Sequence, residues 1–325
     1  MREDALARGL RTLEPHRHSP ETPEARDAII HVLRGRQSHA VAKAAEMAAQ
    51  GSHEDLRGEL KAALQRFLEL PVRADPGCVA KEKCARALVE LGGRDLEDFE
   101  RACHHRQLEP VWGGRVDTAA GLRAVAAMGV ARSLDPAALN LLAELLADAE
   151  TAARVGAARA LGVYGAAGAG ALLRLRVYMG DPDGEVMGEC FSSVLALEGR
   201  AGEAWVGEVL ENVDSPPAVA EAAAMALGSC RSTSAVVLLL GWHRRVTDLN
   251  LRASGAVALA LSRAEGAMDY LIEAVRCGEP RDGRNALEAL VVFRHDESLM
   301  TRLAEAVGRR GDGELDGELE RRLAD

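Results

Sequence analysis

The chain has 325 residues, of which 48% are apolar but only 3% aromatic, and a formal net charge of −10. No run of about 18 uncharged apolar residues occurs, and the first ten residues lack the apolar stretch of a signal peptide, so we expect a cytoplasmic protein without a membrane span. Residues 1–108 carry 18 Lys/Arg and 18 Asp/Glu, whereas residues 109–325 carry 22 and 32, and this acidic balance disfavours nucleic-acid binding, which depends on neutralising phosphates.

The N-terminal part of the chain is predicted to be helical but irregular. Residues 1–14 have helical spacing, which the prolines of PHRHSP (15–20) then interrupt. Thr22 is expected to cap the next helix, with Pro23 in its first position. Further helices are predicted at about 23–34, 38–50 and 52–69. Their inward-facing residues are predicted to be Ile29, Ile30, Leu33, Val41, Ala44, Ala45 and Ala48.

Two segments interrupt the helical pattern further along. Residues 71–77 (PVRADPG) form a turn-rich insertion, and the helix after it is the first regular repeat helix. A partner helix is predicted over 95–108, with Asp95 as its cap. Residues 109–118 (EPVWGGRVDT) then contain a proline and two adjacent glycines, which exclude a regular helix.

From residue 116 onward, helices alternate with short turns. The turns are marked by DPA, DPDG, DSPP and GEPRDG. The last helix, at about 313–323, is strongly polar, as suits a cap on the exposed end of a stack. The helices are predicted at about 116–130, 136–147, 150–164, 167–179, 184–198, 201–212, 216–230, 232–245, 248–263, 265–276, 281–294, 296–308 and 313–323.

One unit recurs along the chain, and Val155–Gly165 (VGAARALGVYG) is its clearest copy. Its alanines allow two helices to approach closely, its leucine fills the space between pairs, and its last glycine accepts the positive φ that ends the helix. Successive copies lie 37, 36, 34, 32, 32 and 31 residues apart, a period that indicates a solenoid. The anchor residues of the seven copies are Leu88, Val125, Leu161, Leu195, Leu227, Leu259 and Leu290.

These patterns predict an all-α fold, an α-solenoid of stacked antiparallel helix pairs like the HEAT and armadillo superhelices. We expect one solenoid over 1–325. It would comprise less regular helices at 1–77, regular repeats at 78–300 and capping helices at 301–325.

The repeats resemble the HEAT-like repeats of phycobilisome lyases, in which a turn Asp and a following Arg lead into an Ala-rich helix. Matching pairs are Asp148 with Arg154, Asp248 with Arg252, and Asp282 with Arg284. The whole chain is also similar to a broad group of bacterial HEAT-repeat proteins to which no single activity is assigned. The resemblance implies the fold, whereas such repeats serve enzymes, scaffolds and chaperone-like proteins alike. In stacked repeats such Asp and Arg side chains form a ladder between turns, so we expect a structural role for these arginines.

We predict no metal and no cofactor. Seven of the nine histidines precede residue 106, but neither they nor the six cysteines have the close spacing of a zinc site. HEAT-fold hydroxylases of the deoxyhypusine type bind iron through repeated His-Glu pairs. The sequence contains only one such pair, His53-Glu54, which cannot build that site, so this class of enzyme is disfavoured. No Ser/His/Asp order, phosphate loop or dinucleotide fingerprint is present either, so an enzymatic activity is disfavoured.

A HEAT-like DNA glycosylase is the main alternative. Its aromatic and basic groups would come from Trp112, Trp205 and Trp242 together with the basic patch that includes Arg244 and Arg245. The absence of a Lys/Arg-rich stripe in an acidic chain counts against it. A lyase or chaperone-like role rests on repeat similarity alone.

The segment around Trp112 has two interpretations. In one, Trp112 is an aromatic anchor for a partner, with polar neighbours of the kind found at interface hot spots. In the other, which we prefer from sequence, Trp112 fills the gap where the stack is interrupted, and Arg115 and Asp117 cap the next helix.

The leading functional hypothesis is a non-enzymatic scaffold or adaptor that binds a protein partner on the concave face of the solenoid. Function is expected where the repeat fails, around 71–77 and 109–118. The candidate partner-binding residues are Arg106, Gln107, Trp112, Arg115, Asp117, Trp242, Arg244 and Arg245.

Overall fold

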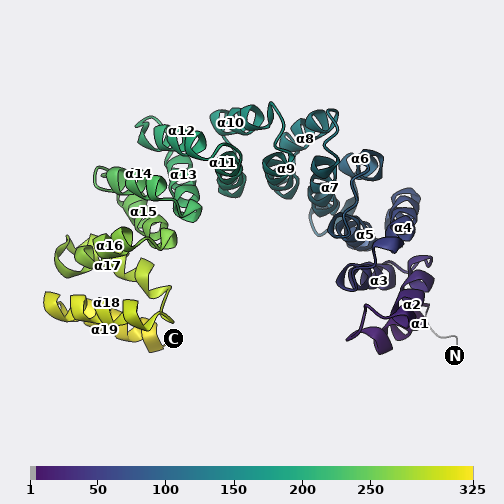
Figure 1. Ribbon diagram of the computed structural model, residues 1–325, viewed down its shortest axis with the longest axis horizontal. Helices are drawn as coiled ribbons and strands as arrows, with labels where there is room; N and C mark the ends of the chain where they lie inside the picture. The colour runs from purple at the N-terminus through teal and green to yellow at the C-terminus, as the bar shows by residue number, and fades with distance from the viewer. Residues whose placement is uncertain (1–4, 325) are drawn as a thin grey trace. The chain divides into compact units, whose positions relative to one another are not determined.

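A computed structural model describes residues 5–324 of the chain and shows an all-α fold, as predicted (Figure 1). Within the described residues, the chain divides into two compact units on either side of the bond between Leu172 and Leu173, which we call the N-terminal and C-terminal units. Within each unit, successive helices pair antiparallel and stack, so each unit is an α-solenoid. None of the helices in residues 5–324 combines the length and the apolar character needed to cross a membrane.

The N-terminal unit stacks α3, α5, α7 and α9 in one layer, with α4, α6 and α8 packed against them as partners. One β-hairpin interrupts the stack between α6 and α7. The elements are α1 (Ala5–Leu13), α2 (Pro23–Leu33), α3 (Ser38–Gln50), α4 (Arg57–Glu69), α5 (Val79–Glu90), α6 (Leu96–Cys103), β1 (Leu108–Val111), β2 (Gly114–Asp117), α7 (Ala120–Ser133), α8 (Ala138–Leu146) and α9 (Thr151–Tyr164), with short 3-10 turns at Glu14–His16, Glu54–Leu56, Val72–Ala74 and Pro76–Cys78.

The C-terminal unit repeats the same arrangement, with α11, α13, α15 and α17 in one layer and α12, α14 and α16 as partners (Figure 1). Helix α10 (Ala169–Met179) lies across the division between the units. The remaining helices are α11 (Gly184–Glu198), α12 (Arg200–Glu211), α13 (Pro217–Cys230), α14 (Thr233–His243), α15 (Leu249–Ser262), α16 (Glu265–Cys277), α17 (Pro280–Val291), α18 (Glu297–Arg310) and α19 (Gly313–Ala324).

The seven predicted anchor residues confirm the repeat. They fall one each on α5, α7, α9, α11, α13, α15 and α17, and all seven are buried. The anchors therefore contribute to the core of each unit, together with buried residues of the even-numbered helices such as Phe67 and Leu142.

Glycine and alanine set the distance between the stacked helices. A Cβ added at Gly156 of α9 would lie 2.4 Å from the Cα of Ala124 in α7, so the two backbones approach too closely for any side chain. Gly165 ends α9 with φ +67°, as the repeat pattern predicts. The small residues of the unit therefore serve close packing and helix termination.

Local signals predicted the helix starts well. Thr22 caps α2 through its side chain, which accepts a hydrogen bond from the Ala25 N–H at 3.2 Å, and Pro23 occupies the first position. Asp95 precedes α6 as predicted, although its side chain accepts no capping hydrogen bond. The predicted inward residues of α3 are all buried, whereas Ile30 of α2 is half-buried.

The chain between α6 and α7 differs from the prediction. The helix predicted over 95–108 ends at Cys103, and the helix predicted from 116 begins at Ala120. Both errors have the same cause. Leu108–Val111 and Gly114–Asp117 pair as antiparallel strands, and these strands include the end of the first predicted helix and the start of the second.

We expect Gly228→Ala to destabilise the C-terminal unit. A Cβ at this position of α13 would lie 2.3 Å from the carbonyl oxygen of Ala258, so the two helices must separate, at a cost of about 1–3 kcal/mol. Urea unfolding followed by circular dichroism measures the change in the free energy of unfolding.

The matched control is Gly188→Ala in α11 of the same unit, where an added Cβ meets nothing within 4 Å. Alanine there should stabilise by roughly 0.5–1 kcal/mol because it restricts the unfolded chain and favours the helix. Equal effects of the two substitutions would contradict the close-packing role of Gly228.

Candidate functional site

The two segments where the repeat fails meet in the structure at the β-hairpin of the N-terminal unit. Strands β1 and β2 pair in antiparallel register, with Leu108 opposite Asp117 and Val111 opposite Gly114. Trp112 and Gly113 form the two-residue turn, in which Gly113 adopts φ +89° and relieves the backbone at the bend. The backbone N–H of Gly77, at the end of segment 71–77, donates to the Glu109 carboxylate of β1 at 2.7 Å.

The tip of the hairpin is apolar and exposed. The Trp112 side chain is 102% exposed, so it does not fill a gap in the stack, and the structural role preferred from sequence is wrong. Leu108, Val111 and Val116 of the same two strands are also exposed. The hairpin therefore exposes several apolar side chains, one of them aromatic, to solvent.

The Glu109 carboxylate fastens β1 to its surroundings. Besides the Gly77 N–H, it accepts hydrogen bonds from the Gln107 side-chain amide and the Thr118 hydroxyl, both at 2.7 Å. These donors hold the pKa of Glu109 below its ordinary value, the Gln107 amide contributing most and the Thr118 hydroxyl next. The carboxylate therefore stays ionised and joins three points of the chain.

A buried ion pair lies beneath the hairpin. The Lys81 ammonium of α5 is 1% exposed and lies 3.1 Å from the Asp75 carboxylate and 2.7 Å from the Gln107 amide oxygen. Gln107 completes the cluster by donating from its amide nitrogen to the Asp75 carbonyl at 2.7 Å. Gln107 is thus a buried structural residue that links the two interrupting segments, although it was a candidate for partner binding.

Arg123 of α7 forms the second half of the cluster. Its guanidinium is fully buried and donates to Asp117 at 2.8 Å and to both carboxylate oxygens of Asp148 at 2.9 Å. A fourth hydrogen bond reaches the His105 carbonyl at 3.0 Å. Arg106 adds a partly exposed contact to Asp148 at 2.7 Å. Arg123 therefore ties the hairpin to the turn before α9.

Asp117 also closes the hairpin at its base. Its carboxylate accepts the backbone N–H groups of Gln107 and Ala119, both at 3.0 Å, as well as the guanidinium of Arg123. Burial alone would raise the pKa of Asp117, but the two N–H donors and Arg123 outweigh it and lower that pKa. Asp117 thus binds the N–H of Ala119, the residue before α7, but Ala119 is the N-cap of that helix and no side chain caps it. Arg115 lies exposed on β2, so the predicted capping of α7 by Arg115 and Asp117 is wrong.

The predicted Asp/Arg ladder between repeat turns is confirmed in the C-terminal unit and extends beyond the expected residues. Arg252 donates to Asp282 of the next turn at 2.8 Å, and Arg284 donates to Glu314 at 3.0 Å. Arg123 and Asp148 form the same contact in the N-terminal unit. Arg154 donates to the carbonyls of Asp148 and Ala149 in its own turn. These arginines connect neighbouring repeats.

The remaining candidate residues lie at the end of α14, apart from the hairpin in sequence and in the other unit. Trp242 is buried, so it belongs to the core of the stack. Arg244 lies over the Tyr270 ring at 5.4 Å, and Arg245 pairs with Glu211 at 2.6 Å. The exposed guanidiniums therefore already have partners on neighbouring repeats.

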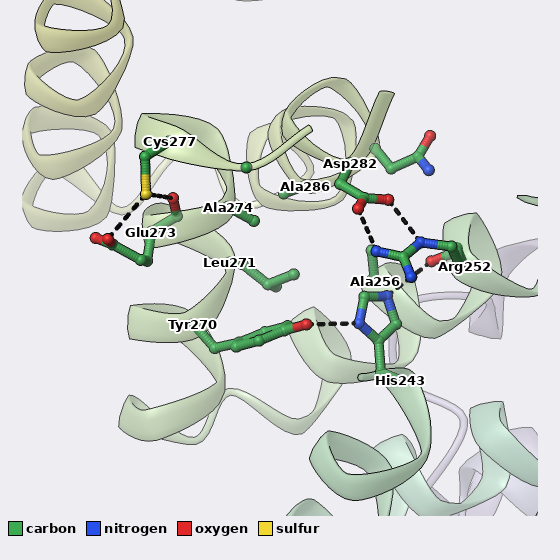
Figure 2. A pocket seen from close by; sticks show the side chains of 12 residues that line it. His243, Arg252, Ala256, Tyr270, Leu271, Glu273, Ala274, Cys277, Asp282 and Ala286 are labelled. Carbon is green, nitrogen blue, oxygen red and sulfur yellow. Dashed lines mark hydrogen bonds and ion pairs between the residues drawn. The ribbon is translucent and has the colours of Figure 1, made fainter. Parts of the chain in front are cut away.

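A hollow of about 200 Å³ lies beside these residues, between α14, α15, α16 and α17 (Figure 2). Several of its polar side chains bind one another, whereas the buried amide nitrogen of Asn285 has no hydrogen-bond partner. The imidazole of His243 contacts the Tyr270 hydroxyl at 3.1 Å and the Arg252 carbonyl at 3.0 Å, while Arg252 pairs with Asp282 (Figure 2). The pKa of His243 is lowered mainly by burial, which disfavours the charged form and keeps the ring neutral.

Cys277, at the other side of this hollow, is held in its protonated thiol form. Its sulfur donates to the Glu273 carboxylate at 3.0 Å, and that hydrogen bond is the main cause of its raised pKa (Figure 2). A thiolate is the reactive form of cysteine, so this arrangement does not supply a nucleophile. Among residues 5–324, no group of three or more His, Cys, Asp or Glu could hold a metal ion.

Sequence reasoning missed Asp75, Lys81, Glu109 and Arg123, which hold the hairpin. A signal was present, because Lys81 and Arg123 lie at positions of α5 and α7 that the repeat buries. A charged residue at a core position requires a buried partner, and the available carboxylates lie in the interrupting segments. The strands also had a signal, since two four-residue segments flank a Trp-Gly pair.

The stacked antiparallel pairs define the chain as a helical-repeat protein. No protein-family model matches the sequence, and no curated protein sequence matches it. The structure is similar to that of the complex of CpcE and CpcF of phycocyanin lyase from Nostoc sp. PCC7120, with 16% identity, a TM-score of 0.42, and coverage of 86% of this chain and 94% of that one.

Two further solved structures are similar to the chain. Human deoxyhypusine hydroxylase has 19% identity and a TM-score of 0.30, covering 80% of this chain and 91% of that one. An engineered protein has 14% identity and a TM-score of 0.27, covering 94% and 97%. The assignment of the chain to the helical-repeat proteins therefore rests on its own antiparallel helix pairs, and not on these similarities.

Replacing Arg123 with methionine should destabilise the N-terminal unit by about 3–5 kcal/mol, because it leaves the buried carboxylates of Asp117 and Asp148 with only the partly exposed Arg106 as a cation. Denaturant unfolding measures the loss. Arg115→Met, on the exposed face of β2, is the matched control and should change stability by less than about 0.5 kcal/mol. A similar small effect for both variants would contradict the role of Arg123.

The stability of the C-terminal unit should fall with acidification in part through His243. The pKa of this ring in the folded protein lies below its ordinary value of 6.5, so the unfolded chain binds the proton more readily. The contribution of His243 is complete above pH 6.5 and is lost as the pH falls below that value.

His243→Gln should therefore show a shallower loss of unfolding free energy between pH 6.5 and about pH 5 than the wild type, by up to about 1.4 kcal/mol per pH unit. Urea unfolding at a series of pH values measures both curves, and carboxylates common to both proteins cancel in the difference. The exposed His18 provides the control substitution, His18→Gln. Parallel curves for wild type and His243→Gln would disprove the assignment.

Proposed function

We propose that the chain is a non-enzymatic scaffold or adaptor whose β-hairpin binds a protein partner through Trp112. The single observation that carries this proposal is the complete exposure of Trp112 at the tip of a hairpin that a buried polar cluster fastens to the helices. An exposed tryptophan costs solubility and contributes nothing to the stability of the stack, whereas it contributes strongly to an interface when a partner buries it.

The fastening of the hairpin supports a binding role. An aromatic residue on a rigid support loses little conformational entropy on association, so more of its burial appears as affinity. Glu109 and Asp117 anchor the two strands, and each accepts several hydrogen bonds. The hairpin therefore presents Trp112 in a fixed direction.

The polar groups around the hollow in the C-terminal unit support a binding protein over an enzyme. A general base or nucleophile needs a free lone pair or a reactive thiolate. Both nitrogens of His243 are engaged, Arg252 is paired with Asp282, and the Cys277 proton is held by Glu273. These contacts stabilise the fold, and they leave none of these three side chains available as a general base or nucleophile.

Photo-crosslinking tests the proposal. A benzophenone amino acid placed at position 112 should give a discrete adduct with one partner protein. The same amino acid at Val163, an exposed position of α9, should not give that adduct. The adduct identifies the partner, whose affinity for the purified chain is then measured by calorimetry.

Trp112→Ala should weaken that affinity by a factor of about 30 or more, the effect of a hot-spot tryptophan. Val163→Ala, the matched exposed apolar control, should change it less than about twofold. Both variants should unfold like the wild type, because neither side chain is buried. An unchanged affinity for Trp112→Ala would refute the proposal.

A further inference from the structure

Three hollows follow one another along one edge of the C-terminal unit. Each lies where the end of an even-numbered helix meets the start of the next odd-numbered helix. Hollow A, of about 440 Å³, lies between α10, α12 and α13. Hollow B, also about 440 Å³, lies between α12, α14 and α15. Hollow C is the space of about 200 Å³ shown in Figure 2, between α14 and α17.

The hollows form a series, one per repeat. Asn212 and Ser215 line both A and B, so these two hollows adjoin each other. Hollows B and C are lined by consecutive residues, Trp242 with His243 on α14, and Leu251 with Arg252 on α15. A chain lying along this edge would meet the three hollows in order.

The floor of the series is aromatic and its walls are apolar. Trp205 lines hollow A, where its ring nitrogen donates to the Tyr178 hydroxyl at 2.8 Å, and Trp242 lines hollow B. The side chains of Tyr178 and Val213 are 70% and 94% exposed, and Met179 beside them is also exposed. These exposed apolar groups gather at the same edge and would be buried by an occupant.

The charge of the edge is negative. The charged side chains that line the three hollows include six carboxylates, namely Glu208, Glu211, Asp214, Asp248, Glu273 and Asp282, and two guanidiniums, Arg245 and Arg252. Both guanidiniums already pair with carboxylates of this set, and Glu273 pairs with Arg276 of the same helix. Glu208 and Asp214 are exposed and have no basic partner among the described residues. An occupant is therefore expected to carry positive charge.

The spacing of the hollows fits an extended peptide. Neighbouring packed helices are about 8–10 Å apart, and three residues of polyproline II chain rise about 9 Å. Every third side chain of such a peptide would therefore reach the next hollow. A helix would instead rise only about 4.5 Å over three residues, so it would reach the next hollow only with every seventh residue.

We propose that this edge binds an extended cationic peptide segment of a partner protein. Apolar side chains at every third position occupy hollows A, B and C, and intervening Lys or Arg side chains pair with Glu208 and Asp214. The site is independent of the Trp112 hairpin, which lies in the other unit.

A designed peptide tests this inference. The probe is a fluorescein-labelled peptide of about twelve residues built from Leu-Lys-Pro repeats, and its anisotropy is followed as the full chain is added. Two control peptides replace the leucines with serine or the lysines with glutamate. We expect saturable binding of the probe, and at least about tenfold weaker binding of each control peptide.

Intrinsic fluorescence locates the binding. The chain contains three tryptophans, so Trp112→Phe leaves only Trp205 and Trp242, which line hollows A and B. The tryptophan emission of this variant should change with the same midpoint as the anisotropy of the probe. Peptide binding that is lost in Trp112→Phe would overturn the proposal, and would show that the hairpin is the site.

Charge reversal at the edge provides the matched pair of variants. Glu208→Lys with Asp214→Lys should weaken probe binding about tenfold, because it replaces attraction with repulsion. Glu305→Lys with Glu320→Lys, on α18 and α19, changes the net charge equally away from the hollows and should leave binding within about twofold. Equal losses for both pairs, equal binding of the control peptides, or no saturable binding at millimolar concentration would each refute the proposal.

Discussion

The guanidinium of Arg123 is fully buried between two carboxylates, and the N-terminal unit is arranged to satisfy it. An arginine in the interior is tolerated only when its charge and its donors are matched, since removing one partner leaves a buried charge uncompensated. Asp148 comes from the turn of the next repeat, as in the ladder elsewhere, but Asp117 comes from the hairpin. The insertion is therefore held by the same kind of contact that joins the repeats.

The same logic extends to Lys81, whose carboxylate partner Asp75 lies in the other interrupting segment. Buried ion pairs contribute little net stability compared with apolar packing, but they tolerate few alternative arrangements. Gln107 bonds to both Asp75 and Lys81, which fixes the start of β1 relative to α5. The buried polar cluster thus fixes the position of the β-hairpin. A two-stranded hairpin on its own would be only marginally stable.

The sequence was sufficient for the helices because their signals are local. Thr22 and Gly165 act at the helix ends where they were expected, and the repeat spacing located every anchor on an odd-numbered helix. The hairpin was missed because its strands are four residues long and its stability comes from distant groups. Arg123 and Asp148 are 25 positions apart, and no local pattern shows that they meet.

The exposure of Trp112 was also beyond local reasoning. A tryptophan beside two glycines suits both a gap-filling and an exposed position, and the choice depends on where the buried cluster directs the strands. The hollows of the C-terminal unit arise in turn from the stacking of successive repeats. Both features belong to the tertiary structure, although the residues that form them can be read in the chain.

The partners of Arg123 also impose an order on folding during synthesis. Asp117 leaves the ribosome before Arg123, but Asp148 follows it by 25 residues. Until the turn before α9 has emerged, the guanidinium has only one of its two carboxylates, so α7 cannot bury it without leaving guanidinium N–H groups that lack an acceptor. The nascent hairpin and α7 therefore pack fully only when the turn before α9 supplies Asp148. The repeat that follows the hairpin completes the hydrogen bonds of Arg123.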